Sequence, residues 1–307
     1  MFLRSLRPRN NLGVLEAVLR LIGERAPFAG ERHTHLLSAK DGWIAVSLAR
    51  PSDVDSVPAW LGTPDLNAVQ DQLVADLVAQ AELLGMPVAA VGEFHGPAIV
   101  RHAFQRIAPT CRTPGTRSSR LGVIDLSSLW AGPLCTRMLA EAGAYVVKVE
   151  STSRPDGARA GSREFYRRLN GRKTHVALDL STAAGVEELR DLINNADVVV
   201  ESSRPRGLEQ LGIVASDFLQ QDDGLRVWAS ITGYGRSSNR VAFGDDAAVA
   251  GGLVKPGPDF VGDAVADPLT GLRAAGAIFE ALEGDQPCLL DIAMAGVARE
   301  VAGNPGE

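Results

Sequence analysis

The sequence predicts an α/β protein: a Rossmann-like large domain with a parallel sheet, preceded by a smaller α+β domain. From residue 121 onward, apolar runs typical of strands alternate with segments of helical spacing, and such alternation favours a mostly parallel sheet. Before it, CRTPGTRSSR combines the Pro, Gly, Ser and Thr residues typical of a linker. We therefore predict a small domain over 1–110, a linker over 111–120 and a large domain over 121–307.

The first 110 residues mix helical and extended patterns. Asp41-Gly42 predicts a hairpin-type turn before a strand, and Gly85 is a typical helix stop after an amphipathic segment. The expected elements are a helix over 12–25, a strand over 43–49, a helix over 67–85 and a strand over 86–93.

The large domain repeats a strand–helix pattern. Ligands of parallel sheets bind at the carboxyl ends of the strands, so the candidate site lies in the loops that follow them. The expected strands are 121–127, 145–150, 176–181, 197–202, 225–235 and 287–294, and the expected helices are 135–143, 184–196 and 270–284.

Composition narrows the class of protein. The chain has 307 residues, 45% of them hydrophobic and 22% charged, which is typical of a globular protein. A net charge of −6 disfavours nucleic-acid binding. Cys111, Cys135 and Cys288 are few and odd in number, which suits a reducing cytoplasm. We see neither a membrane-spanning run nor a signal peptide, so we expect a cytoplasmic protein without a membrane partner.

The turn after the first large-domain strand argues against a dinucleotide. It reads Ala131-Gly132-Pro133, where the dinucleotide fingerprint would read G-x-G-x-x-G. Glu150 does end the second strand, where a ribose-binding acid would lie. An NAD-dependent oxidoreductase is therefore the least favoured enzyme hypothesis.

Five ordered segments resemble the class III CoA-transferases, which include carnitine-CoA transferases and α-methylacyl-CoA racemases. The segments lie between residues 123 and 282, and they are VIDLSSLWAGPLCTRMLAEAGAYVVKVE, FYRRLNGRKTHVALDLST, ADVVVESSRPRGLEQLG, ASITGYG and DPLTGLRAAGAIFEAL. The resemblance implies a CoA-transferase that moves CoA from an acyl-CoA to a carboxylic acid through an aspartyl-CoA thioester. CoA is then a substrate, and no permanently bound cofactor is expected.

The domain order departs from that family. HTHLLSAKDGWIAVSLA and LLGMPVAAVGE resemble its smaller domain, which in the family follows the large one. We therefore expect a circularly permuted chain, which is physically tolerable where the original termini lie close together. The family forms interlocked dimers, and we expect a homodimer here.

Residues 154–175 form a basic cluster in this acidic chain, a pattern typical of a phosphate site or of a solvated charged face. By the resemblance, the turn lines the CoA site and the basic residues reach its phosphates. Arg204 has a helix cap as its alternative role. The candidate CoA-binding residues are Leu129, Trp130, Ala131, Arg154, Arg159, Lys173 and Arg204.

Three carboxylates are candidates for the nucleophile that the resemblance implies. Asp259, after a Pro-Gly-Pro loop, matches the transferase nucleophile best, although a turn aspartate is the plain alternative. Asp263 matches the carboxylate of the racemase branch. Asp245 follows the glycine at the end of a strand, and it or Asp246 has helix capping as its alternative role.

Two other hypotheses stay open. A racemase needs an acid–base pair, and Gly244 stands where that branch has its histidine, which disfavours racemisation. No histidine pair has metal-site spacing. Gln210 replaces a family arginine, and the loop after Asp246 is short. These departures favour a non-catalytic CoA-binding protein or a subunit that needs a partner.

Overall fold

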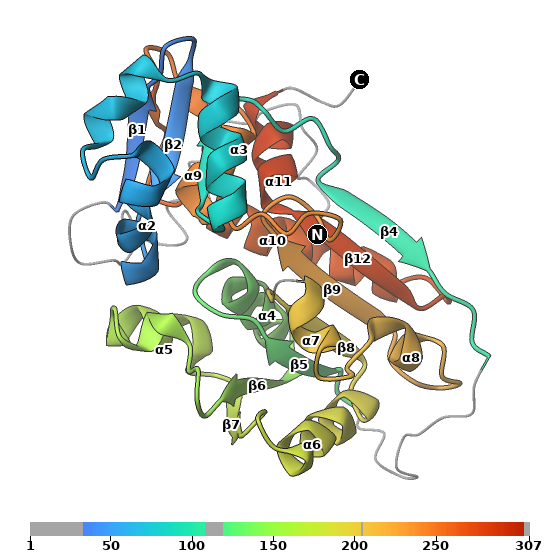
Figure 1. Ribbon diagram of the computed structural model, residues 1–307. Helices are drawn as coiled ribbons and strands as arrows, with labels where there is room; N and C mark the ends of the chain where they lie inside the picture. The colour runs from blue at the N-terminus through green and yellow to red at the C-terminus, as the bar shows by residue number, and fades with distance from the viewer. Residues whose placement is uncertain (1–32, 108–118, 204, 304–307) are drawn as a thin grey trace. The chain divides into compact units, whose positions relative to one another are not determined.

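The computed structural model describes residues 33–107, 119–203 and 205–303 (Figure 1). The expected helix over 12–25 and Cys111 lie outside these residues. The chain divides into two compact units, which we call unit 1 and unit 2. Unit 1 takes its described residues from 1–98, 232–269 and 293–307, and unit 2 takes them from 99–231 and 270–292.

This division differs from the predicted one. The chain first passes between the units at Ala98, not at the linker over 111–120. Strand β4 (Ile99–Ala103) precedes that linker and yet pairs antiparallel with β12 (Cys288–Ala293) in unit 2. The segment 232–269, expected in the large domain, belongs to unit 1. The composition of a segment can indicate a loop. It does not show which distant segments form pairs of strands in the fold.

Unit 2 is built around a seven-stranded sheet, as far as the described residues show, in the order β4-β12-β9-β8-β5-β6-β7. The central pairs β6–β5, β5–β8 and β8–β9 are parallel, as is the edge pair β6–β7. This confirms the predicted α/β class. The remaining strands are β5 (Gly122–Leu126), β6 (Tyr145–Ser151), β7 (Thr174–Leu178), β8 (Val198–Glu201) and β9 (Val227–Thr232).

Helices flank this sheet along the chain. The helix after β5 begins at Ala131, four residues earlier than predicted, because proline is well tolerated in a first helical turn and Pro133 does not delay the start. The helices are α4 (Ala131–Glu141), α5 (Arg163–Asn170), α6 (Ala183–Asn194), α7 (Pro205–Glu209), α8 (Ala215–Leu219) and α10 (Ala266–Leu282), with a short η3 (Gly157–Arg159). None of the helices among the described residues is long and apolar enough to cross a membrane.

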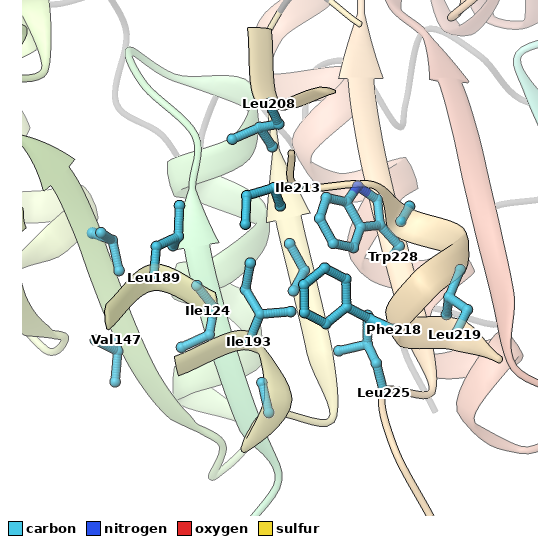
Figure 2. Close-up of a cluster of buried hydrophobic side chains, with 14 of the residues drawn as sticks. Ile124, Val147, Leu189, Ile193, Leu208, Ile213, Phe218, Leu219, Leu225 and Trp228 are labelled. Carbon is cyan, nitrogen blue, oxygen red and sulfur yellow. The ribbon is translucent and has the colours of Figure 1, made fainter. Parts of the chain in front are cut away.

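The core of unit 2 lies between the sheet and helices α6 and α8. Figure 2 shows Ile193 of α6 and Phe218 of α8 among the side chains of this cluster, with Ile124 and Trp228 from the sheet. Each such side chain contributes about 1.5–3 kcal/mol when fully buried. Cys135 and Cys288 of the described chain are buried free thiols.

Unit 1 contains a three-stranded antiparallel sheet in the order β1-β2-β3. The predicted hairpin is confirmed, because Ala39 donates its N–H to the carbonyl of Gly42 at 2.8 Å between paired strands. The strands are β1 (Thr34–Ser38), β2 (Trp43–Ser47) and β3 (Val88–Ala90), and a separate hairpin pairs β10 (Val254–Lys255) with β11 (Asp259–Phe260).

The helix expected over 67–85 is interrupted. The described chain forms a short η2 (Leu66–Asp71) and then α3 (Val74–Leu84), because Asp41 accepts the Val74 N–H at 2.8 Å and fixes a new helix start. Gly85 ends α3 with a φ of 66°, as a C-terminal glycine does. The other helices of unit 1 are α2 (Pro51–Leu61), α9 (Gly244–Ala250) and α11 (Met294–Ala302).

Candidate functional site

The turn between β5 and α4 is tight and strained. Leu129 has a φ of 67°, in the left-handed region that side chains rarely adopt. Gly132 is required by close approach, because a Cβ there would lie 2.1 Å from the Cβ of Ser127. The backbone at residues 129–132 is therefore held in one conformation beside the first turn of α4, where the helix field favours anions.

Asp125 anchors this turn from the end of β5. Its carboxylate is fully buried, and it accepts the Ser127 N–H at 3.0 Å and the Thr136 hydroxyl at 2.6 Å. Lys173 donates to it at 2.8 Å. Burial alone would raise the pKa of Asp125, but the charges of Lys173 and Lys148 outweigh it and hold that pKa below its usual range.

Lys173 is buried rather than exposed to ligand. Its ammonium group donates to Asp125, to the carbonyl of Pro133 at 2.9 Å and to Asn170 Oδ1 at 2.7 Å. An ammonium has three protons, and these three acceptors use all of them. The geometry therefore assigns Lys173 to joining β5, α4 and α5, and leaves it no donor for a phosphate.

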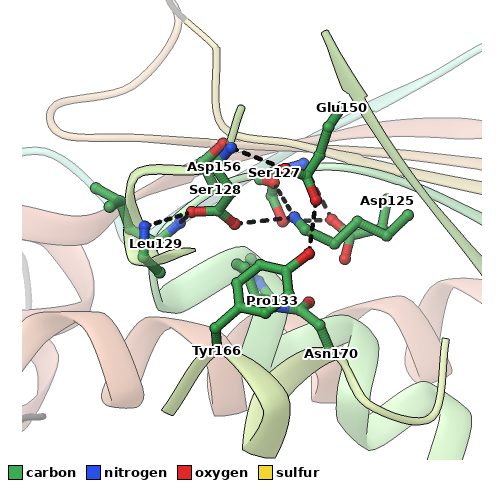
Figure 3. A network of polar contacts seen from close by, with 12 residues as sticks. Asp125, Ser127, Ser128, Leu129, Pro133, Glu150, Asp156, Tyr166 and Asn170 are labelled. Carbon is green, nitrogen blue, oxygen red and sulfur yellow. Dashed lines mark hydrogen bonds and ion pairs between the residues drawn. The ribbon is translucent and has the colours of Figure 1, made fainter. Parts of the chain in front are cut away.

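A second buried ion pair ties the loop after β6 to the same turn. Asp156 accepts the N–H of Leu129 and that of Ala158, each at 3.0 Å. Lys148 lies 3.1 Å from the other oxygen of Asp156 and donates to the carbonyl of Ser127 at 2.6 Å. Figure 3 shows these contacts converging between Asp125 and Leu129. Loop 154–159 is thus fixed against the turn.

Glu150, at the end of β6, completes the network. It accepts the N–H of Asp156 at 2.8 Å and the hydroxyl of Tyr166 at 2.6 Å, and it pairs with Arg159 at 2.9 Å. Burial opposes its ionisation, but the bonds from Arg159 and Tyr166 lower the pKa of Glu150 to about 2. The Arg159 guanidinium also lies 4.3 Å from the centre of the Tyr166 ring.

The structure thus brings most of the candidate CoA-binding residues together. Leu129 and Ala131 line the turn, and Arg159 is joined to it through Glu150 and Asp156. Arg154 lies exposed in the same loop. Arg204 lies outside the described residues.

Trp130 is buried, and it packs edge-on against Phe165 of α5 with ring centroids 5.3 Å apart. Its indole N–H has no hydrogen-bond partner within the described chain. A buried donor without a partner is costly, so this N–H is an unused polar group beside the turn.

The candidate nucleophiles lie in unit 1 and differ in burial. The side chain of Asp259 is 67% exposed on the β10–β11 hairpin, 3.4 Å from Lys255. Asp263 is exposed as well. Asp245 is buried and accepts the N–H of Ala264 at 2.7 Å.

The helix-capping alternative applies to Asp246 rather than to Asp245. Asp246 accepts the N–H of Phe243 at 3.0 Å, which closes the first turn of α9. It also accepts the Ser47 hydroxyl at 2.6 Å, so it joins α9 to β2.

One carboxylate was missed by sequence reasoning. Asp267 is half-buried in the first turn of α10, where the helix dipole favours a negative charge. A Cβ on Gly244 would lie 2.3 Å from Asp267 Oδ2, so glycine at 244 makes room for this carboxylate. The signal was present in DPLTG, an aspartate opening a long helix within a segment that resembles the family.

Among the described residues, no group of three or more His, Cys, Asp or Glu side chains is placed to hold a metal ion. A parallel sheet whose first strand is followed by a tight turn and a helix defines a Rossmann-like α/β fold. The model of CoA-transferase family III matches residues 119–304, and the chain belongs to that family.

Curated relatives agree with this assignment. An acyl-CoA transferase of Fusarium pseudograminearum is 34% identical over 184 residues, which are 52% of this chain and 40% of that protein. The succinate–glutarate CoA-transferase of Agrobacterium fabrum is 33% identical over 186 residues, 53% and 46% of the two chains. A formyl-CoA:oxalate CoA-transferase of Escherichia coli is 31% identical over 176 residues, 52% and 42% of the two chains. The chain therefore spans less than half the length of these relatives.

Solved structures give the same fold. Rv3272 from Mycobacterium tuberculosis superposes with a TM-score of 0.54 at 28% identity, covering 60% of this chain and 55% of that one. A CAIB/BAIF family protein from Brucella suis gives a TM-score of 0.54 at 29% identity, with the same two coverages.

Proposed function

We propose that this protein is an acyl-CoA:carboxylate CoA-transferase that acts through an aspartyl-CoA thioester. The observation that supports it most is the buried Asp125–Lys173 and Asp156–Lys148 network, which holds a strained strand–helix turn within the family-matched region. Its substrates are then an acyl-CoA and a carboxylic acid, and CoA is bound as a substrate rather than as a permanent cofactor.

The proposed CoA site is the turn of Leu129, Trp130 and Ala131 with the loop that carries Arg154 and Arg159. The first N–H groups of a helix lack partners within the helix, so the start of α4 suits a phosphate. Arg154 is exposed and Arg159 is half-exposed, so both are available to an anion, whereas Lys173 is not. Lys173 is proposed to act only by fixing the turn.

The reaction needs a carboxylate nucleophile. It attacks the thioester carbonyl and expels the CoA thiolate, which leaves a mixed anhydride. The thiolate then attacks the aspartyl carbonyl and releases the first carboxylate. The acceptor carboxylate repeats these two steps in reverse and restores the aspartate, so no oxidant or cofactor is required.

Burial favours Asp267 over Asp259 in this role. A carboxylate nucleophile requires limited hydration, and the 67% exposed side chain of Asp259 does not meet that requirement. Asp267 is half-buried, lies at a helix N-terminus and is bordered by a glycine. Asp263 is exposed, and Asp245 already accepts a backbone N–H, so neither is preferred.

The test is peptide mass spectrometry after incubation with acetyl-CoA, succinyl-CoA or formyl-CoA and quenching with hydroxylamine. Wild type and Asp259→Ala are expected to give an aspartyl hydroxamate at Asp267, and Asp267→Asn is expected to give none. A hydroxamate at Asp259 would keep the transferase and overturn the choice of residue.

The second candidate is a CoA-binding protein that is inactive alone or needs a partner. This candidate is favoured by the share of each relative that the match covers. The matched relatives are more than twice as long as the region they share with this chain. CoA binding measured by calorimetry without any hydroxamate from the three donors would support this candidate. Absence of CoA binding at millimolar ligand would exclude both.

The racemase alternative is disfavoured by geometry. A side chain at Gly244 would collide with Asp267 and with the carbonyl of Ala264 at 2.4 Å, so the position has no room for a proton-transferring group. The homodimer, the permuted domain order and the cytoplasmic location stay predictions. The relatives differ in their acyl donors and acceptors.

A further inference from the structure

The backbone just before α10 is strained. Ala264 has a φ of 46°, in the left-handed region that an alanine rarely adopts. Its carbonyl accepts the N–H of Asp267 at 3.0 Å, so the conformation of residue 264 sets how α10 begins. A different backbone conformation at residue 264 would reorient the first turn of α10, and with it the Asp267 side chain.

Asp245 holds this strained residue from another helix. Its Oδ1 accepts the N–H of Ala264 at 2.7 Å, and the carboxylate is buried at the start of α9. The bond joins positions 19 residues apart, so the local chain does not impose it. A buried charged acceptor makes a stronger bond to an N–H than a neutral one does.

The neighbouring residue adds a steric constraint. At Gly244, a Cβ would lie 2.4 Å from the carbonyl of Ala264 and 2.3 Å from Asp267 Oδ2. The start of α9 therefore approaches the start of α10 closely at 244 and bonds to it at 245. Two adjacent residues fix both the backbone and the space around one carboxylate.

We propose that Asp245 is a positioning residue, whose bond to Ala264 keeps that residue left-handed and so orients the carboxylate of Asp267. The proposal rests on the proposed function for its catalytic consequence, but the bond itself is testable without activity. Asp245 then acts through Ala264, and it does not touch the substrate.

The first experiment is hydrogen exchange on the full chain, resolved at the amide of Ala264. Asp245→Ala should speed exchange at this amide about tenfold or more, because its acceptor is lost. Asp245→Asn should keep most of the protection, since its amide oxygen also accepts. Asp55→Ala, an exposed aspartate of α2, is the matched control and should change nothing at 264.

Glycine at 264 separates positioning from general stability. Because glycine adopts a positive φ freely, Ala264→Gly should restore protection of the Asp267 amide in the Asp245→Ala background. If that amide exchanges as fast in the double variant as in Asp245→Ala, or if Asp245→Ala leaves Ala264 protected, the proposal is overturned. Should Asp245→Ala fail to fold, Asp245→Asn and the single Ala264→Gly still test it, since both must retain protection at Asp267.

The second experiment measures hydroxamate formation at Asp267 with succinyl-CoA, alongside CoA affinity. Asp245→Ala should slow adduct formation at least tenfold with CoA affinity unchanged, and both Asp245→Asn and the Ala264→Gly double variant should recover it. If Asp245→Asn is as inactive as Asp267→Asn while Ala264 stays protected, Asp245 acts chemically and the positioning role is wrong. If wild type forms no adduct, the proposed function fails, and the exchange data alone decide the role of Asp245.

Discussion

Asp156 accepts the backbone N–H of Leu129 at 3.0 Å, across 27 residues of chain. The same arrangement recurs in unit 1, where Asp245 accepts the N–H of Ala264. In both cases a buried aspartate bonds the amide of a left-handed, non-glycine residue just before a helix. The fold thus holds two strained turns by distant carboxylates instead of by glycine.

Removing the carboxylate of Asp156 should destabilise the protein strongly. Asp156→Ala leaves Lys148 buried without its counter-charge and frees the Leu129 turn, which should cost about 3–5 kcal/mol of unfolding free energy. Urea unfolding measures this loss. Asp55→Ala, at an exposed aspartate of α2, is the control and should stay within about 0.5 kcal/mol of wild type. Equal midpoints for the two variants would contradict the role given to Asp156.

Lys173 and Asp125 should be strongly coupled. Lys173→Met leaves the Asp125 carboxylate buried and uncompensated, at a cost of about 3–5 kcal/mol, whereas Lys173→Met combined with Asp125→Asn removes both charges. The double variant should therefore be less destabilised than the sum of the two single variants. A double-mutant cycle in urea measures the coupling, and strict additivity would argue against the pair.

The buried Asp246 should make stability depend on pH. Burial raises the pKa of Asp246 from 3.8 to about 7, against the lowering effect of bonds from Ser47 and Phe243, while the charge of Asp245 adds to the rise. A raised folded-state pKa means that the contribution is complete below about pH 4 and is lost as pH rises through 7. The loss is on the order of 4 kcal/mol.

Unfolding midpoints between pH 4 and 8 test this linkage. Asp246→Asn keeps an oxygen for Ser47 and cannot ionise, so it should flatten the slope in this range. Burial and the charge of Asp246 both raise the pKa of Tyr234 above its usual range, so this phenol adds no slope between pH 4 and 8. A slope that persists in Asp246→Asn would assign it to another group.

Two glycine-to-alanine changes should have opposite signs. Gly132→Ala places a Cβ 2.1 Å from that of Ser127, and the forced shift should cost about 1–3 kcal/mol and weaken CoA binding. Gly276→Ala in α10 meets nothing within 4 Å and should stabilise by about 0.5–1 kcal/mol. Thermal unfolding and CoA calorimetry on both variants measure the pair. A neutral Gly132→Ala would mean that the turn yields more easily than the contact implies.

Much of the fold was predictable because it depends on periodicity. Strand β5 and helix α6 carry apolar spacing that only one secondary structure satisfies. The residues of the turn, Leu129 and Ala131, followed from their place between strand and helix. These are local properties of the chain, so the sequence expresses them directly.

The roles of single side chains were less predictable, because they depend on contacts across the fold. In the sequence, Lys173 looks like one more basic residue of its segment. In the fold it is buried and donates to Asp125, 48 residues earlier. Asp259 reads as a nucleophile beside a glycine loop, yet that loop is an exposed hairpin. Gly244 leaves room for the carboxylate of Asp267, and no pattern along the chain connects the two.

Segments far apart in the sequence close each unit, and this sets an order for synthesis. Strand β4 (Ile99–Ala103) leaves the ribosome long before its partner β12 (Cys288–Ala293) does. Likewise, the Ser47 hydroxyl cannot form its hydrogen bond until Asp246, 199 residues later, has been translated. Nascent chains stalled before β12 would therefore carry an unpaired strand, and such exposed edges are sites of aggregation. The sheet of unit 2 is therefore completed only after β12 has been translated.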